Sequence, residues 1–162
     1  MMPWDTGLWF PALIMLPLLA ALVSFLLGRR GLPWLPLTTA LLIILALLGL
    51  TYQIWDAGPQ RYAIGGWGAP LGIDLYGDGL SLVMMWLTAG VVTLVSPYAL
   101  HYFHDAPDES EGFWPLCLLL WAALNALFLA ADIFNLYVTL ELLTLAAVAL
   151  VNTSRMPMPF SM

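Results

Sequence analysis

Long runs of apolar residues recur along almost the whole chain, separated by short polar stretches. Each run is about 20 residues long, which is the length a helix needs to cross a hydrocarbon layer of about 30 Å. The runs are rich in leucine and lack the alternation of a membrane-spanning strand, so their backbone groups must pair within helices. The pattern predicts an all-α integral membrane protein with five transmembrane helices, at 8–27, 33–54, 79–103, 113–131 and 134–151.

The stretch between the second and third runs is the longest polar segment, over residues 55–77. It is rich in glycine, and residues 72–76 alternate apolar and polar side chains as a strand does. We expect a short, β-hairpin-like loop there, on the outer face of the membrane. The fourth and fifth runs are separated only by the turn at Asp132, which predicts an antiparallel helix hairpin. Residues 1–154 should thus form a single transmembrane domain, followed by a C-terminal tail over 155–162.

Composition supports this class of protein and excludes several others. Hydrophobic residues make up 62% of the chain and charged residues 9%, whereas a soluble domain has about a quarter charged residues. Four scattered arginines and no lysine leave no basic patch for a nucleic acid. The chain lacks a phosphate-binding loop, a cysteine cluster and a nucleophile elbow. We therefore expect neither a cofactor nor a catalytic site of its own, and the chain is at most one subunit of a translocating enzyme.

The arginines also predict an orientation. Arg29 and Arg30 follow the first apolar run, and Arg155 follows the fifth, so all three fall on the same side. Basic residues near membrane spans favour the cytoplasmic side, which places the N-terminus outside. Arg61 alone falls on the outer side. The expected location is the cell (inner) membrane, with several crossings.

Glu141 is the clearest candidate for chemistry because it is an acid inside an apolar run. It lies about 10 Å along the fifth predicted helix, at 1.5 Å per residue. A carboxylate there costs at least roughly 2.5–3.5 kcal/mol, and such residues usually face a bundle interior and serve ion pathways. Tyr137, Thr144 and Asn152 fall on the same side of the helix, which favours an inward polar stripe. The alternative is a protonated glutamate that only bonds neighbouring helices together.

Other polar residues have simpler interpretations. Asn125 lies inside the fourth run, where its amide is expected to bond across the helix hairpin. Asp132 and Asp78 precede helices, where acids act as caps and favour the helix dipole. His101 and His104 lie close together at the end of the third run, but they are too few to indicate a metal site.

Three segments resemble a known family. Residues 132–143, DIFNLYVTLELL, are similar to the signature between the fourth and fifth helices of antiporter-like proton-translocating membrane subunits. These subunits occur in respiratory complex I, multisubunit cation/proton antiporters and membrane-bound hydrogenases. The segments DGLS at 78–81 and YALHYF at 98–103 resemble the third helix of the same family. The amino-acid sequence of the turn is most similar to that of the D-type subunit of multisubunit sodium/proton antiporters.

The resemblance implies a specific chemistry. In the family, the glutamate matched by Glu141 pairs with a lysine on a later, discontinuous helix, and proton occupancy of the pair drives translocation. This chain ends at Met162 and has no lysine. We therefore expect a split or truncated subunit that another chain completes, or a remnant without function.

The sequence thus predicts a fragment of a proton-translocating or cation/proton-translocating subunit within a multisubunit membrane complex. Glu141 would be a buried proton carrier, and the supporting polar residues would be Tyr137, Thr144, Asn125 and Asp132. The partners would be other integral membrane subunits, including one that supplies lysine-bearing helices, and the ions would be protons or protons and sodium. The alternative is a structural or assembly subunit, or a truncated remnant, without transport activity.

Overall fold

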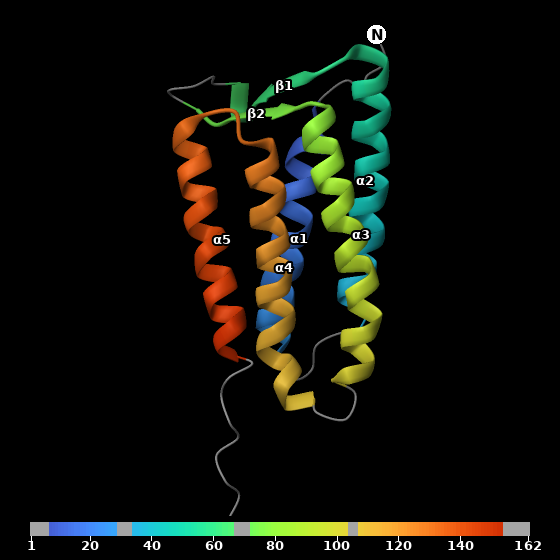
Figure 1. The fold of residues 1–162 in the computed structure, drawn as a ribbon, viewed down its shortest axis with the longest axis vertical. Helices are drawn as coiled ribbons and strands as arrows, with labels where there is room; N and C mark the ends of the chain where they lie inside the picture. The colour runs from blue at the N-terminus through green and yellow to red at the C-terminus, as the bar shows by residue number, and fades with distance from the viewer. Residues whose placement is uncertain (1–6, 29–33, 67–71, 104–106, 154–162) are drawn as a thin grey trace, which may run out of the picture.

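The computed structural model describes residues 7–28, 34–66, 72–103 and 107–153. Five of its helices are long and apolar enough to cross a membrane, and a small antiparallel sheet lies between the second and third (Figure 1). The predicted fold class is therefore confirmed. The elements are α1 (Trp9–Leu27), α2 (Leu35–Ala57), β1 (Gln60–Ala63), a 3-10 turn (Ile64–Gly66), β2 (Asp74–Gly77), α3 (Gly79–Tyr102), α4 (Pro107–Leu129) and α5 (Ile133–Thr153).

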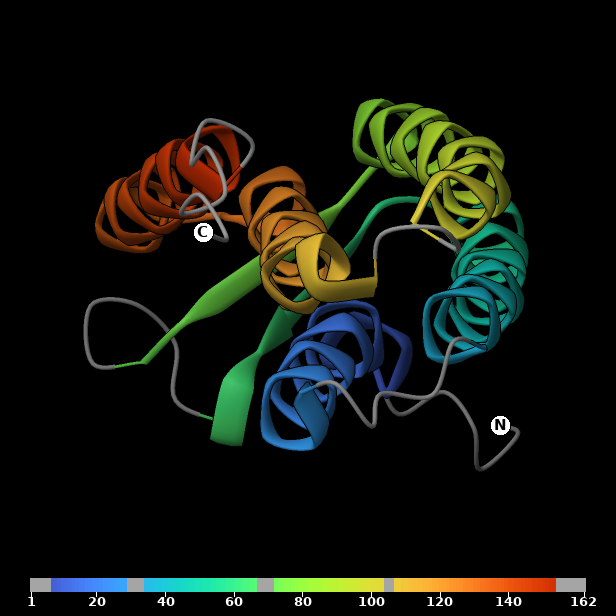
Figure 2. The same cartoon turned by 90° about the horizontal axis from the view of Figure 1, so that it is seen from below.

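The helices run side by side, and α4 lies at the centre of the arrangement. Seen along the bundle, α4 contacts α1, α3 and α5, while α2 packs between α1 and α3 (Figure 2). Helix α5 lies at one edge and packs mainly against α4. Most of the surface of α5 is consequently not covered by the rest of the described chain.

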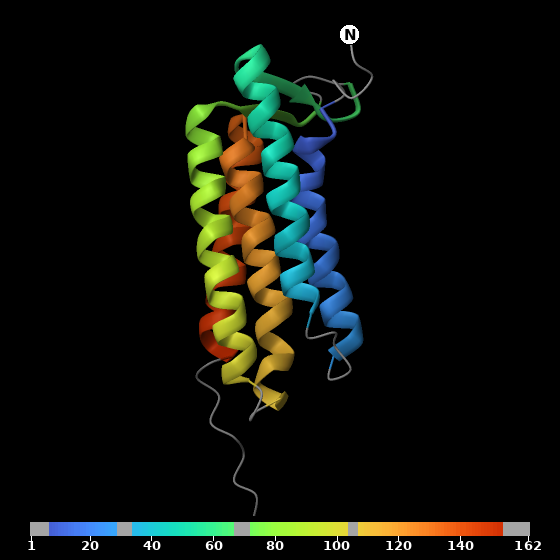
Figure 3. The same ribbon diagram turned by 90° about the vertical axis from the view of Figure 1, so that its right-hand side faces the viewer.

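The two strands lie across one end of the bundle (Figure 3). They pair in antiparallel fashion, with Ala63 opposite Asp74. Leu75 is buried and forms an isolated bridge with Ala130, and the Ala131 amide donates to the Asp74 carbonyl over 3.1 Å. The hairpin therefore rests on the turn that joins α4 to α5.

The hairpin also contacts the first helix. The rings of Phe10 and Tyr62 stack with their centroids 5.9 Å apart. Gly77 lies so close to Phe10 that an added Cβ would be 2.9 Å from a ring carbon. The second contact needs the hairpin backbone to approach α1 closely, which a glycine without a Cβ permits.

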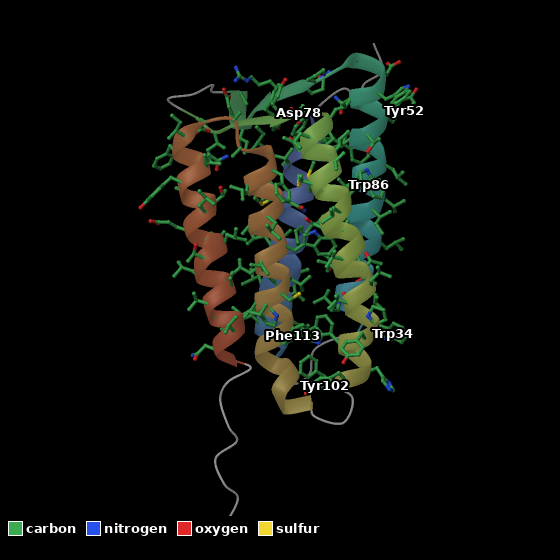
Figure 4. The ribbon with its side chains drawn as sticks, viewed as in Figure 1. Trp34, Tyr52, Asp78, Trp86, Tyr102 and Phe113 are labelled. Carbon is green, nitrogen blue, oxygen red and sulfur yellow. The ribbon has the colours of Figure 1, made fainter. Side chains whose placement is uncertain are left out.

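Two partly buried side-chain hydrogen bonds join α3 to its neighbours. The Trp86 indole donates to Thr51 Oγ1 on α2 over 3.0 Å, and Trp86 is labelled between these helices in Figure 4. The Ser81 hydroxyl donates to the Phe128 carbonyl on α4 over 2.8 Å. Apolar burial does little to hold helices together in lipid, because lipid tails are as apolar as the side chains, so such polar contacts help to fix the arrangement.

Helix α4 begins earlier than the sequence predicts. The fourth predicted helix begins at 113, whereas the structure begins α4 at Pro107 and includes the acidic stretch at 107–111 in it. Proline at the first helical position is preorganised for a helix, and acids nearby favour the positive end of the helix dipole. The hydropathy pattern missed these turns because they are polar.

Asp78 caps the start of α3, as predicted. Its Oδ1 accepts a hydrogen bond from the Ser81 backbone N–H over 2.8 Å. This hydrogen bond stabilises the ionised carboxylate and lowers the pKa of Asp78 from its ordinary value of 3.8. Because the pKa of Asp78 is lower in the folded protein, the cap stabilises the fold fully above pH 3.8. This stabilisation is lost as the pH falls through the pKa that Asp78 has in the folded protein.

Replacing Asp78 by alanine is expected to lower the free energy of unfolding by about 1 kcal/mol at neutral pH, the usual worth of a helix cap. Detergent titration followed by circular dichroism measures this loss. Asp78→Asn is the matched control, because asparagine caps equally well but does not titrate. The difference in free energy of unfolding between wild type and Asp78→Asn should therefore change on acidification below pH 3.8. If this difference in free energy stays constant with pH, Asp78 does not act as an ionised cap of α3.

Candidate functional site

One side of α5 packs on α4 and the other side carries Glu141. The buried residues of α5 are Asn135, Thr139 and Ala146, with exposed fractions of 9%, 5% and 1%. These three share one face of the helix. Glu141 is exposed, and it lies roughly 140° around the helix from that face, at 100° per residue.

The polar stripe of α5 therefore does not face the interior of the described helices. Tyr137 is 61% exposed, and Glu141 and Thr144 are exposed as well. This differs from the predicted inward orientation. The small side chain of Ala146 and the short polar chains of Asn135 and Thr139 allow the close approach to α4. The carboxylate is thus directed away from the other described helices.

Two of the three polar residues predicted to share a face with Glu141, Tyr137 and Thr144, line the same depression as Glu141, whereas Asn152 does not. Tyr137, Leu140, Glu141, Thr144 and Leu145 line an open depression of about 460 Å³. The Tyr137 hydroxyl is within hydrogen-bonding reach of the Glu141 carboxylate one turn away. Thr144 donates its hydroxyl to the Leu140 carbonyl over 2.8 Å, within the same helix. Glu141 and Tyr137 are therefore the two groups of this face that can bind or relay a proton.

Asn125 is part of a different contact. Its side-chain amide donates to the Leu13 carbonyl on α1 over 2.8 Å, and Asn125 is only 1% exposed. The predicted bond across the α4–α5 hairpin is therefore wrong. Pro17 lies inside α1, four residues after Leu13. A proline has no N–H, so the Leu13 carbonyl has no helical donor, and Asn125 supplies one.

Asp132 caps α5, also as predicted. Its Oδ1 accepts from the Asn135 backbone N–H over 2.7 Å. The other carboxylate oxygen of Asp132 is buried without a hydrogen-bond partner in the described part of the chain, as are Oδ1 of Asp74 and Nδ2 of Asn135. Asp74 is only 8% exposed, although the sequence suggested a surface loop. Its burial depends on the hairpin resting on the α4–α5 turn, which no local pattern reveals.

No group of three or more metal-ligating side chains occurs among the described residues. His101 lies at the exposed end of α3, and His104 is outside the described residues. Neither Asp132 nor Asn125 belongs to the depression around Glu141. The site on α5 therefore consists of a carboxylate, a phenol, the Thr144 hydroxyl and two leucines.

Comparison with known proteins gives no matching family model, but it finds relatives. The chain is 33% identical over 143 residues to mnhD2, described as an antiporter subunit, of Staphylococcus haemolyticus; the match covers 86% of this chain and 28% of the relative. It is 34% identical over 146 residues to the NADH-quinone oxidoreductase subunit N of Desulforudis audaxviator, covering 86% of this chain and 29% of the relative.

A solved structure agrees with these sequences. The chain superposes on a subunit of the membrane-bound sulfane sulfur reductase, an archaeal respiratory membrane complex, with a TM-score of 0.76 and 27% identity. That match covers 86% of this chain and 29% of the solved one. This chain thus spans less than a third of the length of the relatives it matches. Sequence and fold together show that the chain is similar, over most of its own length, to part of the antiporter-like membrane subunits.

Proposed function

We propose that this chain works within a membrane complex that translocates protons, or exchanges protons for cations, and that Glu141 carries the proton. The relatives are named as antiporter and NADH-quinone oxidoreductase subunits, which supports this class of activity. The observation that carries the residue assignment is the position of Glu141 on a face of α5 that the described chain leaves uncovered. Transport by a Glu141→Gln variant is the direct test.

The depth of Glu141 argues that protein covers this face in the working complex. The residue lies about 12 Å from the start of α5 at Ile133, at 1.5 Å per residue. A glutamate side chain is too short to reach the membrane surface easily from there, and ionisable groups in spans almost always face protein or water. Leu145 and Val148, on the same side of α5, are 69% and 64% exposed. Further helices must therefore pack there for a charged Glu141 to be tolerated.

We infer that the covering segment supplies a cation. The described part of the chain places no basic residue in the depression around Glu141. A cation close to the carboxylate stabilises its charged form, and withdrawal of that cation favours proton uptake. The family resemblance implies the same kind of partner for Glu141, a lysine on a helix outside this segment. Movement of the cation would then couple proton binding at Glu141 to the rest of the complex, with Tyr137 as the adjacent relay.

Photo-crosslinking tests whether this face is covered. A benzoylphenylalanine in place of Leu145 is expected to form a protein adduct in the complete membrane complex, because an apposed helix would lie within reach. Leu94 on α3 is the reference position, since it is 77% exposed and lies beside the exposed apolar side chains of Leu87 and Val91, where lipid can cover it. Adducts to lipid alone at position 145 would contradict the proposed covering helix.

A further inference from the structure

Two buried polar atoms of α4 have complementary hydrogen-bonding needs. Trp121 and Asn125 are each only 1% exposed. Within the described structure, neither the Trp121 Nε1 nor the Asn125 Oδ1 has a hydrogen-bond partner. The indole nitrogen is a donor, and the amide oxygen is an acceptor.

The orientation of the Asn125 amide is fixed by its contact with α1. The amide nitrogen donates to the Leu13 carbonyl over 2.8 Å. A carbonyl only accepts hydrogen bonds, so turning the amide over would place two oxygens against each other. The Asn125 oxygen must therefore point away from the Leu13 carbonyl, and it needs a different donor.

Trp121 is placed to provide that donor indirectly. The two residues are one turn apart on α4, so they lie on the same face with Cβ atoms about 5–6 Å apart. Their polar atoms nevertheless do not meet in a direct hydrogen bond. A buried donor and a buried acceptor that are close neighbours but do not bond to each other are a usual setting for a bridging water.

We propose that an internal water molecule binds between the Trp121 indole and the Asn125 amide. The water accepts from Trp121 Nε1–H and donates to Asn125 Oδ1, which satisfies both atoms. Buried waters typically bind polar groups that otherwise lack partners, with two to four hydrogen bonds each. The Leu13 carbonyl, the Asn125 amide, the water and the Trp121 indole then form one continuous chain between α1 and α4. This site is separate from Glu141 and does not depend on the proposed function.

Nuclear magnetic resonance of the indole groups tests the site. The full chain, labelled with nitrogen-15 at the tryptophan indoles, is reconstituted in lipid nanodiscs, and Trp121→Phe assigns the signal. The Trp121 N–H is expected to show a cross-peak to water. Trp86 is the matched control, because its indole is bonded directly to Thr51 Oγ1. In Asn125→Leu the Trp121 signal should shift and its water cross-peak should weaken by at least half.

Each outcome decides the proposal. A Trp121 signal with no more water contact than Trp86 would overturn it, and so would a water cross-peak that Asn125→Leu leaves unchanged. If Asn125→Leu does not fold, the wild-type spectrum alone still distinguishes a hydrated indole from a dry one. If Trp121 instead bonds directly to Asn125, the Trp121 indole signal would shift in Asn125→Leu, but the wild-type protein would show no water cross-peak. That result would also overturn the proposal.

Discussion

Replacing Glu141 by glutamine is expected to reduce proton movement by the complete membrane complex to the background of vesicles that lack it. Glutamine has nearly the same shape but cannot bind and release a proton, so the carrier is lost. Assembly should survive, because the amide can still hydrogen-bond to Tyr137. Proton uptake into reconstituted vesicles, followed with a pH-sensitive dye, measures the result.

Two further variants sharpen this experiment. Asp56→Asn makes the same chemical change at an exposed position near the end of α2, and it is expected to leave transport unchanged. Glu141→Asp keeps the carboxylate but shortens it by one methylene, so transport should fall only partly. Undiminished proton movement in Glu141→Gln would show that the carboxylate is not the carrier, whereas loss of the assembled complex would indicate a role in packing.

Replacing Asn125 by leucine is expected to lower the free energy of unfolding by about 1–2 kcal/mol, the range for losing a buried hydrogen bond between membrane helices. The variant leaves the Leu13 carbonyl without a donor, because Pro17 cannot supply the helical one. Detergent unfolding monitored by circular dichroism gives the value.

A double-mutant cycle with Pro17→Ala isolates the cause. Alanine restores a backbone N–H four residues after Leu13, so the freed carbonyl regains a partner within α1. The cost of Asn125→Leu should then shrink, whereas Pro97→Ala in α3 should leave that cost unchanged, because distant sites are additive. An equal cost of Asn125→Leu in wild-type and Pro17→Ala backgrounds would rule out the proposed role of the proline.

The number of helices, their approximate bounds and the hairpin could be predicted from sequence because they follow from local patterns. Apolar runs of membrane length leave the backbone no alternative to a helix. The caps at Asp78 and Asp132 were equally predictable, since each contacts a residue three positions further along. The segment 132–143 carried the family resemblance for the same reason, being a continuous motif. The early start of α4 was missed because hydropathy does not register polar helical turns.

Only the tertiary structure decided which side of each helix meets protein. Periodicity showed that Tyr137 and Glu141 share a face, but not that α4 packs against the opposite one. Asn125 was known to need a partner, yet that partner is the Leu13 carbonyl, 112 positions away. Asp74 is buried because the hairpin packs on the α4–α5 turn. A sequence fixes directions around each helix, whereas the neighbours in those directions depend on how distant helices pack.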